Sequence, residues 1–386
     1  MTQIANAPLV APQVTPILPK WWHSVDRAVL GAVLLLMAGG VLLSFASSPH
    51  LAARNSVDPF YYAYRHMIFV GIAAAVMIVV SMLSVQTIRR LAMVGFVAAL
   101  VGVFATLYFG EAFESGARRW LRIGGFTVQP SEFLKPSFMI AAGWFIAASR
   151  RVNGPPGILI SLVSLGIILI LLRFQPDIGQ SVLMLFGFAV MLWVVGVPAV
   201  YFIGLTGLLA VGGYVVYNTL DYIRRRVDVF LEGDPDPTSQ IGMVQTAIEA
   251  GGFWGRGLGA GTVHERLPDV HTDFVIAIPA EEFGVLFVFM VIAVYVFIFF
   301  HVLQRALHIQ DVFQRVATSG LIFVFTAQAF INLGVAAQFL PSKGMTLPFL
   351  SNGGSSMVAL GITMGAILAF TRRDPVPQGR GLEGRV

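Results

Sequence analysis

Long runs of apolar residues, separated by short polar stretches, make up most of this chain. Most of the runs approach the length of about 20 residues that an α-helix needs to cross the hydrocarbon core of a bilayer. In lipid the backbone has to satisfy its own hydrogen bonds, so the runs are expected to be helices rather than strands. The pattern therefore predicts an all-α polytopic membrane protein with ten transmembrane helices, at Ala28–Ser47, Met67–Val85, Leu91–Phe109, Phe133–Ala148, Ile158–Leu172, Ser181–Val197, Ala199–Tyr217, Phe274–His301, Val316–Phe339 and Ser356–Phe370.

Prolines and glycines inside these runs are interpreted as kinks or close approaches, not as helix ends. Pro136 lies within the fourth run, and only Gly196-Val197-Pro198 separates the sixth run from the seventh. Residues 1–20 are rich in Pro, Ala and Val without a helical period, which is typical of a disordered tail. The chain is thus predicted to comprise a tail at 1–20, a transmembrane domain at 21–373 and a second tail at 374–386.

Basic residues in the short loops indicate the orientation. Arginine pairs at 89–90, 150–151 and 372–373 lie on the side that also carries both termini. Cytoplasmic loops are enriched in Lys and Arg, so both termini are predicted to be cytoplasmic. The long polar loop at about 218–273 and most of the other polar motifs then face outward.

The amino-acid composition further limits the class of protein. The chain of 386 residues is 56% hydrophobic and 12% charged, with a mean hydropathy of +0.79. Soluble domains carry roughly twice that charge. There is no Cys, which excludes disulfides and thiolate catalysis, and the net charge of +5 is scattered without a stripe for nucleic acid.

Basic and acidic residues near the fourth run are the first candidates for chemistry. Arg118, Arg119 and Arg122 have the spacing of one helical turn, and guanidinium groups suit phosphate or diphosphate because they donate paired hydrogen bonds. A cluster that contacts lipid headgroups is the alternative. Glu132 and Lys135 lie three residues apart on one helix face, where a structural ion pair is equally consistent with the spacing.

Two later stretches add polar groups. Asp177, in a short linker between two runs, is a candidate partner for Lys135, and a solvated carboxylate in a Pro turn is the alternative. The glycine-rich stretch Gly251–Gly261 has no surrounding strand–turn–helix unit, so we reject dinucleotide binding. Its glycines are expected to let the backbone approach a ligand or a helix closely.

The stretch Leu267–Gly284 contains Asp273, our candidate for the catalytic carboxylate. An Asp in front of an apolar helix is also an ordinary N-cap, which is the alternative interpretation. A metal site of His264, Asp269 and His271 lacks any recognised ligand spacing, and we predict no metal site in the protein.

Residues 340–356, with two prolines, three glycines and four serines, cannot simply extend a helix. Irregular backbone at membrane depth is tolerated where it lines a cavity, and a re-entrant connector is the alternative. Lys343 in this stretch is a candidate for binding an anionic headgroup.

Six ordered motifs resemble SEDS proteins, the peptidoglycan glycosyltransferases with a division (FtsW) and an elongation (RodA) branch. They are G-A-R-R-W (116–120), Q-P-S-E-F-L-K (129–135), Q-P-D-I-G (175–179), L-P-D-V-H-T-D-F (267–274), A-E-E-F-G (280–284) and L-P-S-K-G-M-T-L-P-F-L-S-N-G-G-S-S (340–356). The resemblance spans about residues 22–373, and Lys343-Gly344 is more like the division branch. The chain departs from the family pattern at Asn352, where Tyr is usual, and at Gln180, where Thr is common.

The resemblance implies polymerisation of lipid II on the outer face of the cytoplasmic membrane, with Asp273 as the catalytic residue. It also implies a class B penicillin-binding transpeptidase (FtsI-like) and other divisome proteins as partners, beside membrane lipid and undecaprenyl-pyrophosphate-linked glycan. No cofactor follows from the motifs, although Mg²⁺ or Mn²⁺ is an alternative to basic side chains at the leaving group. The candidate substrate-binding residues are Arg118, Arg119, Arg122, Glu132, Lys135, Asp177, His271, Lys343, Ser351 and Ser355.

Two other functions are consistent with ten helices and interior charges: a flippase for the lipid-linked precursor, and a non-catalytic divisome scaffold. A carrier is expected to have its site at the membrane midplane. Here the motifs gather on one predicted face, which favours an enzyme.

Overall fold

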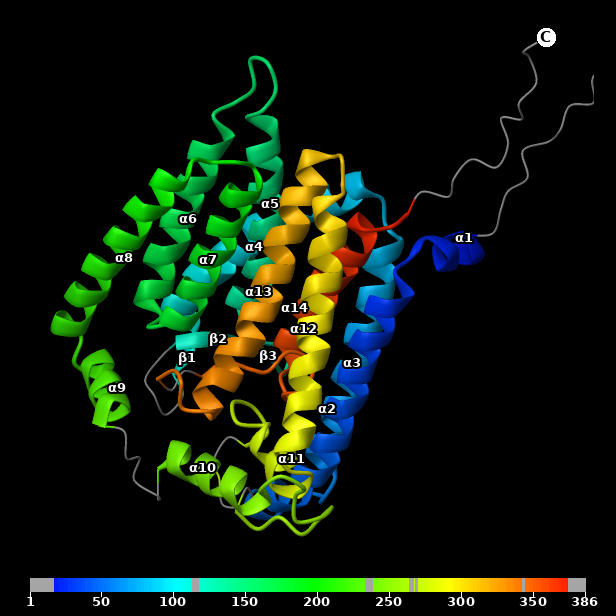
Figure 1. Cartoon of the computed structure of the whole chain (residues 1–386), viewed down its shortest axis with the longest axis vertical. Helices are drawn as coiled ribbons and strands as arrows, with labels where there is room; N and C mark the ends of the chain where they lie inside the picture. The colour runs from blue at the N-terminus through cyan, green and yellow to red at the C-terminus, as the bar shows by residue number, and fades with distance from the viewer. Residues whose placement is uncertain are drawn as a thin grey trace, which may run out of the picture.

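The structure is a computed structural model that describes residues 17–112, 118–232, 239–263, 267, 270–341 and 344–373. The chain forms a bundle of long helices that run alternately up and down, with a small β-sheet and short helices at one end (Figure 1). The long helices are α2 (Arg27–Arg54), α3 (Tyr61–Met82), α4 (Val85–Phe109), α5 (Pro130–Ala148), α6 (Gly157–Phe174), α7 (Ile178–Val194), α8 (Ala199–Thr219), α12 (Val285–Leu307), α13 (Val312–Ala336) and α14 (Gly354–Phe370).

Each predicted apolar run overlaps one of these helices, which confirms the fold class. In the part of the chain that the structure describes, six helices are long and apolar enough to cross a membrane, namely α2, α3, α4, α6, α12 and α13. α7 and α14 are apolar but have only 17 residues each. The protein is an integral membrane protein, and the number of ten spans stays a prediction.

The two ends of the bundle differ. We call the end where α2 begins and α14 ends the terminal end; α1 (Ile17–Ser24) also lies there (Figure 1). We call the opposite end the hairpin end, because it carries the strands. Its elements are β1 (Glu111–Ala112), β2 (Arg118–Ile123), β3 (Phe126–Val128), α9 (Asp221–Glu232), α10 (Gln240–Gly251) and α11 (Ala277–Glu282).

Several helices begin or end a few residues away from the predicted runs, and three features differ more. The eighth run, Phe274–His301, is not one helix: Gly284 has φ +80°, a conformation that glycine adopts without strain, and α12 begins after it. The long polar loop contains α9 and α10, whose apolar content is too small to stand out as a span. α1 begins at Ile17, so the last four residues of the predicted tail are helical, and residues 1–16 and 374–386 lie outside the described residues.

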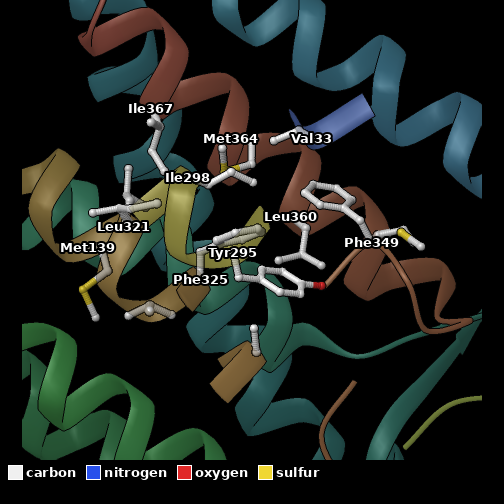
Figure 2. Packing of buried hydrophobic residues seen from close by; sticks show 14 of the residues in the cluster. Val33, Met139, Tyr295, Ile298, Leu321, Phe325, Phe349, Leu360, Met364 and Ile367 are labelled. Atoms are coloured by element: carbon white, nitrogen blue, oxygen red, sulfur yellow. The ribbon is translucent and has the colours of Figure 1, made fainter. Parts of the chain in front are cut away.

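α13 forms the centre of the bundle. Of its most apolar window 72% is buried, against 22% for the same measure in α12. Leu321 and Phe325 of α13 pack among Tyr295 of α12 and Leu360 of α14 (Figure 2). In lipid, helices associate through close packing and polar contacts rather than through the hydrophobic effect. Polar side chains on this central helix are therefore well placed to organise the site.

Candidate active site

Asp273 lies in a turn-rich stretch, residues 270–276, that we call the aspartate segment. Two hydrogen bonds hold the backbone of the aspartate segment. The Asn352 backbone N–H donates to the His271 carbonyl at 2.8 Å, and the Asn332 side chain donates through Nδ2 to the Asp273 carbonyl at 2.7 Å. Asn332 Nδ2 also reaches the Met345 carbonyl at 2.5 Å. The aspartate segment is thus fastened to α13 and to residues 344–353, which we call the return segment.

The Asp273 carboxylate lies against the backbone of the return segment. A Cβ atom at Gly344 would be 2.9 Å from Oδ2 of Asp273, closer than ordinary van der Waals contact. Residue 273 itself is neither fully buried nor fully exposed. It does not cap a helix, because the N-caps of α11 and α12 are Ile276 and Gly284. The N-cap alternative for Asp273 is therefore wrong.

The return segment has an unusual backbone that the core holds in place. Phe349 has φ +64°, a left-handed conformation that is rare for an aromatic residue and costs of order 1–3 kcal/mol. Its ring is buried and packs against Phe325 with centroids 5.9 Å apart (Figure 2). Tyr295 Oη donates to the Pro348 carbonyl at 2.5 Å. Ser351 is 2% exposed, and its Oγ accepts the Leu347 amide at 2.8 Å.

A chain of buried polar side chains leads from the return segment into the bundle. Gln328 of α13 donates to the Thr346 carbonyl at 3.0 Å and accepts from Lys135 Nζ at 2.7 Å. Lys135 also pairs with Glu132 at 2.9 Å, and both side chains are only 5% exposed. Because each charge has a partner, the desolvation that burial imposes on an unpaired ion is largely offset.

The polar chain continues to the linker between α6 and α7. The Gln180 side chain donates through Nε2 to Glu132 Oε1 at 2.7 Å. The Gln180 backbone N–H donates to Asp177 Oδ1 at 3.3 Å. Asp177 lies 4.0 Å from Arg119, not beside Lys135, so the predicted direct pair of Lys135 with Asp177 is wrong. Burial raises the pKa of the Asp177 carboxyl above its ordinary value, and the Arg119 guanidinium opposes that rise.

The three arginines at 118, 119 and 122 lie on a strand, not on the predicted helical turn. β2 pairs with β3 around Gly124-Gly125, both of which have positive φ, as a two-residue hairpin loop requires. Strand alternation separates the arginines onto two faces. Arg119 donates to the Gln175 and Pro176 carbonyls at 3.1 and 2.6 Å, Arg122 pairs with Glu111 at 2.9 Å, and Arg118 is exposed.

Of the three remaining candidate site residues, the structure describes the positions of Ser355 and His271 but not of Lys343. Ser355 Oγ accepts a hydrogen bond from the Gln129 backbone N–H at 3.3 Å, where β3 leads into α5. The His271 ring lies 6.1 Å from the Tyr62 ring, measured between centroids. Lys343 lies outside the described residues, as do His264 and Asp269. Among the residues with a described position, no group of three or more His, Asp or Glu could hold a metal ion.

The glycine-rich stretch packs against α11, as expected for close backbone approach. A Cβ at Gly251 or Gly255 would overlap the carbonyl oxygens of Ala280 or Glu282, at 1.9 and 2.2 Å. Glu281 is buried and accepts the amides of Thr262 and Val263 at 2.8 and 3.0 Å. These contacts fix the loop beside the helix that follows the aspartate segment.

Sequence reasoning missed the central role of three amides. Gln328 and Asn332 lie four residues apart on α13 and therefore on one face, and both are buried. Gln180 joins Asp177 to Glu132 at the start of α7. Polar residues within an apolar run are expensive in lipid, so their presence in the run Val316–Phe339 was the available signal.

The fold and the site define an integral membrane protein whose partly exposed carboxylate lies where two irregular segments meet at one end of a helical bundle. The family profile of FtsW, RodA and SpoVE, described as "Cell cycle protein", matches residues 26–374. The chain belongs to this family.

Curated relatives share the name "Probable peptidoglycan glycosyltransferase FtsW". The protein of Caulobacter vibrioides (strain NA1000 / CB15N) is 41% identical over 93% of this chain and 92% of its own length. That of Trichlorobacter lovleyi is 33% identical over 89% of this chain and 92% of its own length.

Solved structures share the fold. A chain from a structure described as "Structural coordination of polymerization and crosslinking by a peptidoglycan synthase complex" has a TM-score of 0.77 and 27% identity, covering 91% of this chain and 98% of that one. The rod shape determining protein RodA of Thermus thermophilus has a TM-score of 0.67 and 24% identity over 91% of this chain and 97% of that one. At that lower identity the likeness concerns the fold alone.

Proposed function

We propose that this protein is a peptidoglycan glycosyltransferase that polymerises lipid II into glycan strands during septal cell division. Family membership and the name of the curated relatives support the activity, at identities of 41% and 33% over most of the chain. The division role is favoured by the same names and by the Lys343-Gly344 motif.

Asp273 is the proposed general base. A sugar hydroxyl of one lipid-linked disaccharide attacks the anomeric carbon of another, a C–O bond forms, and the bond to undecaprenyl pyrophosphate breaks. Asp273 accepts the hydroxyl proton, while the leaving pyrophosphate takes the bonding electron pair. Because the leaving group is already acidic, the second carboxylate of typical glycosidases is unnecessary.

The fixed position of Asp273 is the observation that carries this assignment. Its carbonyl is held by Asn332, the preceding His271 carbonyl by Asn352, and its carboxylate rests against Gly344. A general base contributes about 10²–10⁴-fold when it is held within reach of its proton. A partly exposed carboxylate at a segment junction suits that role.

The other candidate residues divide into three groups. Arg118 and Arg122 share one face of β2 and, with Lys343, are proposed to bind the pyrophosphate; Arg122 also pairs with Glu111, but its side chain is 65% exposed. A divalent cation is an alternative source of positive charge. Arg119, Glu132, Lys135 and Asp177 form buried or half-buried ion pairs, so their proposed role is to support the polar chain behind the site. His271, Ser351 and Ser355 form the third group, which is also proposed to contact the substrate.

We place the protein in the cytoplasmic membrane with both termini in the cytoplasm and the hairpin end outside. The basic loops favour this orientation, and lipid II would then be polymerised where the glycan is assembled. A class B penicillin-binding transpeptidase is the proposed partner, since a structure of similar fold is described as coordinating polymerisation with crosslinking. Other divisome proteins are expected to join it.

Purified protein in detergent, supplied with lipid II, provides the test. We expect glycan chains longer than the starting disaccharide, because a polymerase needs no sealed bilayer. A flippase or a scaffold would give no polymer under these conditions. Absence of polymer from folded protein, with and without added Mg²⁺ or Mn²⁺ and with the partner transpeptidase present, would overturn the proposal.

A further inference from the structure

A cavity of about 470 Å³ opens at the terminal end of the bundle. α12 rises about 30 Å between Val285 and Arg305, so the cavity is remote from the aspartate segment. Its volume falls within the range of about 300–1,000 Å³ in which ligand pockets lie. Side chains from the ends of α12 and α14 line it, among them His301, Arg305, His308, Phe370, Arg372 and Arg373.

Among the described residues, the lining of this cavity contains three arginines and no carboxylate. Asp26, at 2% exposure, lies beside it and meets Arg305 Nε at 2.8 Å and His301 Nε2 at 2.9 Å. The same carboxylate caps α2 by accepting the amides of Ala28 and Val29. Asp26 is thus the ion-pair partner of Arg305, whereas Arg373, in the same lining, has no carboxylate partner among the residues described by the structure.

The three arginines differ in the contacts that their guanidinium groups already make. Arg372 donates to the Leu83 carbonyl at 2.7 Å, as basic residues near helix ends commonly do. Arg305 uses Nε for its shortest contact with Asp26, so its two terminal nitrogens are not needed for that contact. Arg373 is exposed, and within the described part of the chain its guanidinium has no hydrogen-bond or ion-pair partner.

Membrane topology alone would explain scattered basic residues at this end. It does not explain why they converge on a cavity, or why the buried Asp26 beside the cavity holds the lining residue Arg305 in an ion pair. Guanidinium forks match phosphate oxygens, and basic pockets between transmembrane helices bind anionic lipid headgroups. Phe370 and Ile309 add apolar surface beside the arginines, which suits the glycerol and first acyl carbons of a lipid.

We propose that this cavity binds the phosphate of an anionic phospholipid headgroup, with Arg305 and Arg373 as its main contacts. The site lies outside the polymerisation machinery and does not depend on the proposed function. A bound lipid would join α1, α2, α12 and the end of α14, because Asp26 at the start of α2 pairs with Arg305 of α12 and the Arg373 backbone N–H donates to the Ser24 carbonyl of α1 at 3.0 Å.

Melting of the purified full chain in a non-ionic detergent tests the proposal. The probes are short-chain phosphatidylglycerol, phosphatidylcholine and inorganic phosphate, each titrated to obtain an apparent Kd from the rise in melting temperature. The variants are Arg373→Gln and Arg305→Gln, and Arg151→Gln is the matched control, since Arg151 is an exposed arginine of the same end that does not line the cavity.

We expect phosphatidylglycerol to raise the melting temperature saturably and phosphatidylcholine to have no comparable effect. Arg373→Gln should weaken phosphatidylglycerol binding about tenfold, while Arg151→Gln leaves it unchanged; tenfold corresponds to about 1.4 kcal/mol. Arg305→Gln should weaken it similarly if the variant folds, and the Arg373 variant decides the matter if it does not. An equal effect of inorganic phosphate would support a phosphate site for a soluble anion, whereas equal binding by Arg373→Gln and Arg151→Gln would overturn the site.

Discussion

Replacing Gly344 by Ala tests how closely the return segment positions the catalytic carboxylate. The added Cβ would lie 2.9 Å from Asp273 Oδ2, and ordinary contact begins at about 3.4 Å. One of the two groups has to move by about 0.5 Å. The carboxylate is the end of a side chain, whereas residue 344 is backbone held by the neighbouring Met345–Asn332 hydrogen bond, so we expect the carboxylate to move.

The size of this displacement allows the expected loss of kcat to be estimated. A misplacement of about 1 Å in an active site can cost 10²-fold, so a shift of about half that size is expected to cost roughly tenfold in kcat. Gly344 has no positive φ, and Ala at this position is not strained by its backbone. The melting temperature should therefore change little.

The assay is lipid II polymerisation by purified protein in detergent, with the melting temperature of each variant measured alongside. Gly353→Ala is the matched control in the same segment. A Cβ at Gly353 would meet nothing nearer than 3.5 Å, and its φ of −171° is open to any residue. We expect this control to polymerise like the wild type.

Wild-type kcat in the Gly344→Ala variant would refute the idea that this close approach fixes the carboxylate. A rate loss of equal size in both glycine variants would also refute it, because the loss would then come from the segment as a whole.

Three further substitutions test the polar network. Lys135→Met leaves the Glu132 carboxylate buried without its cation and is expected to cost about 3–5 kcal/mol, measured as a lower melting temperature; adding Glu132→Gln should recover much of the loss. Asn332→Leu removes the tethers to the Asp273 and Met345 carbonyls, so kcat in the polymerisation assay should fall by more than the loss of folded protein explains. Asp177→Asn should flatten the dependence of melting temperature on pH: because burial raises the folded pKa, wild-type stability falls as pH rises from about 3.9 through that raised value.

Each of these three predictions has a result that would contradict it. If the double variant of Lys135 and Glu132 melts no higher than Lys135→Met, the pair does not act as a unit. If Asn332→Leu keeps wild-type kcat, the tethers do not position the aspartate segment. If Asp177→Asn shows the wild-type pH slope, another group titrates.

Helix positions were predictable because run length and hydropathy dominate in a bilayer. α5 continues through Pro136, and the break between α7 and α8 falls at Gly196–Pro198 as interpreted from the sequence. The eighth run was overextended, because Phe274–Ile278 are as apolar as a span although they form turns and part of a short helix. Hydropathy does not distinguish buried irregular backbone from membrane-spanning helix.

The β-hairpin was missed because arginines at 118, 119 and 122 also fit a helical turn. The two glycines at 124 and 125, flanked by short β-prone stretches, are a recognised hairpin signal that should have outweighed that spacing. Once the strand is known, alternation explains why Arg119 faces the α6–α7 linker while Arg122 does not.

The partners of the buried charges could not be predicted locally. Lys135 meets Gln328, which lies 193 residues later in the chain, and Gln180 stands between Glu132 and Asp177. Such pairings depend on how the helices pack, which periodicity along one helix does not contain. Asp273 was identifiable from its motif, but the tethers that hold it came only from the fold.

Polymerisation of lipid II by the Asp273→Asn variant tests the central claim most directly. The amide is nearly isosteric with the carboxylate but cannot accept the sugar proton, so we predict a loss of at least about 10²-fold in rate with an unchanged melting temperature. Glycan formation at near the wild-type rate by this variant would mean that another group takes the proton.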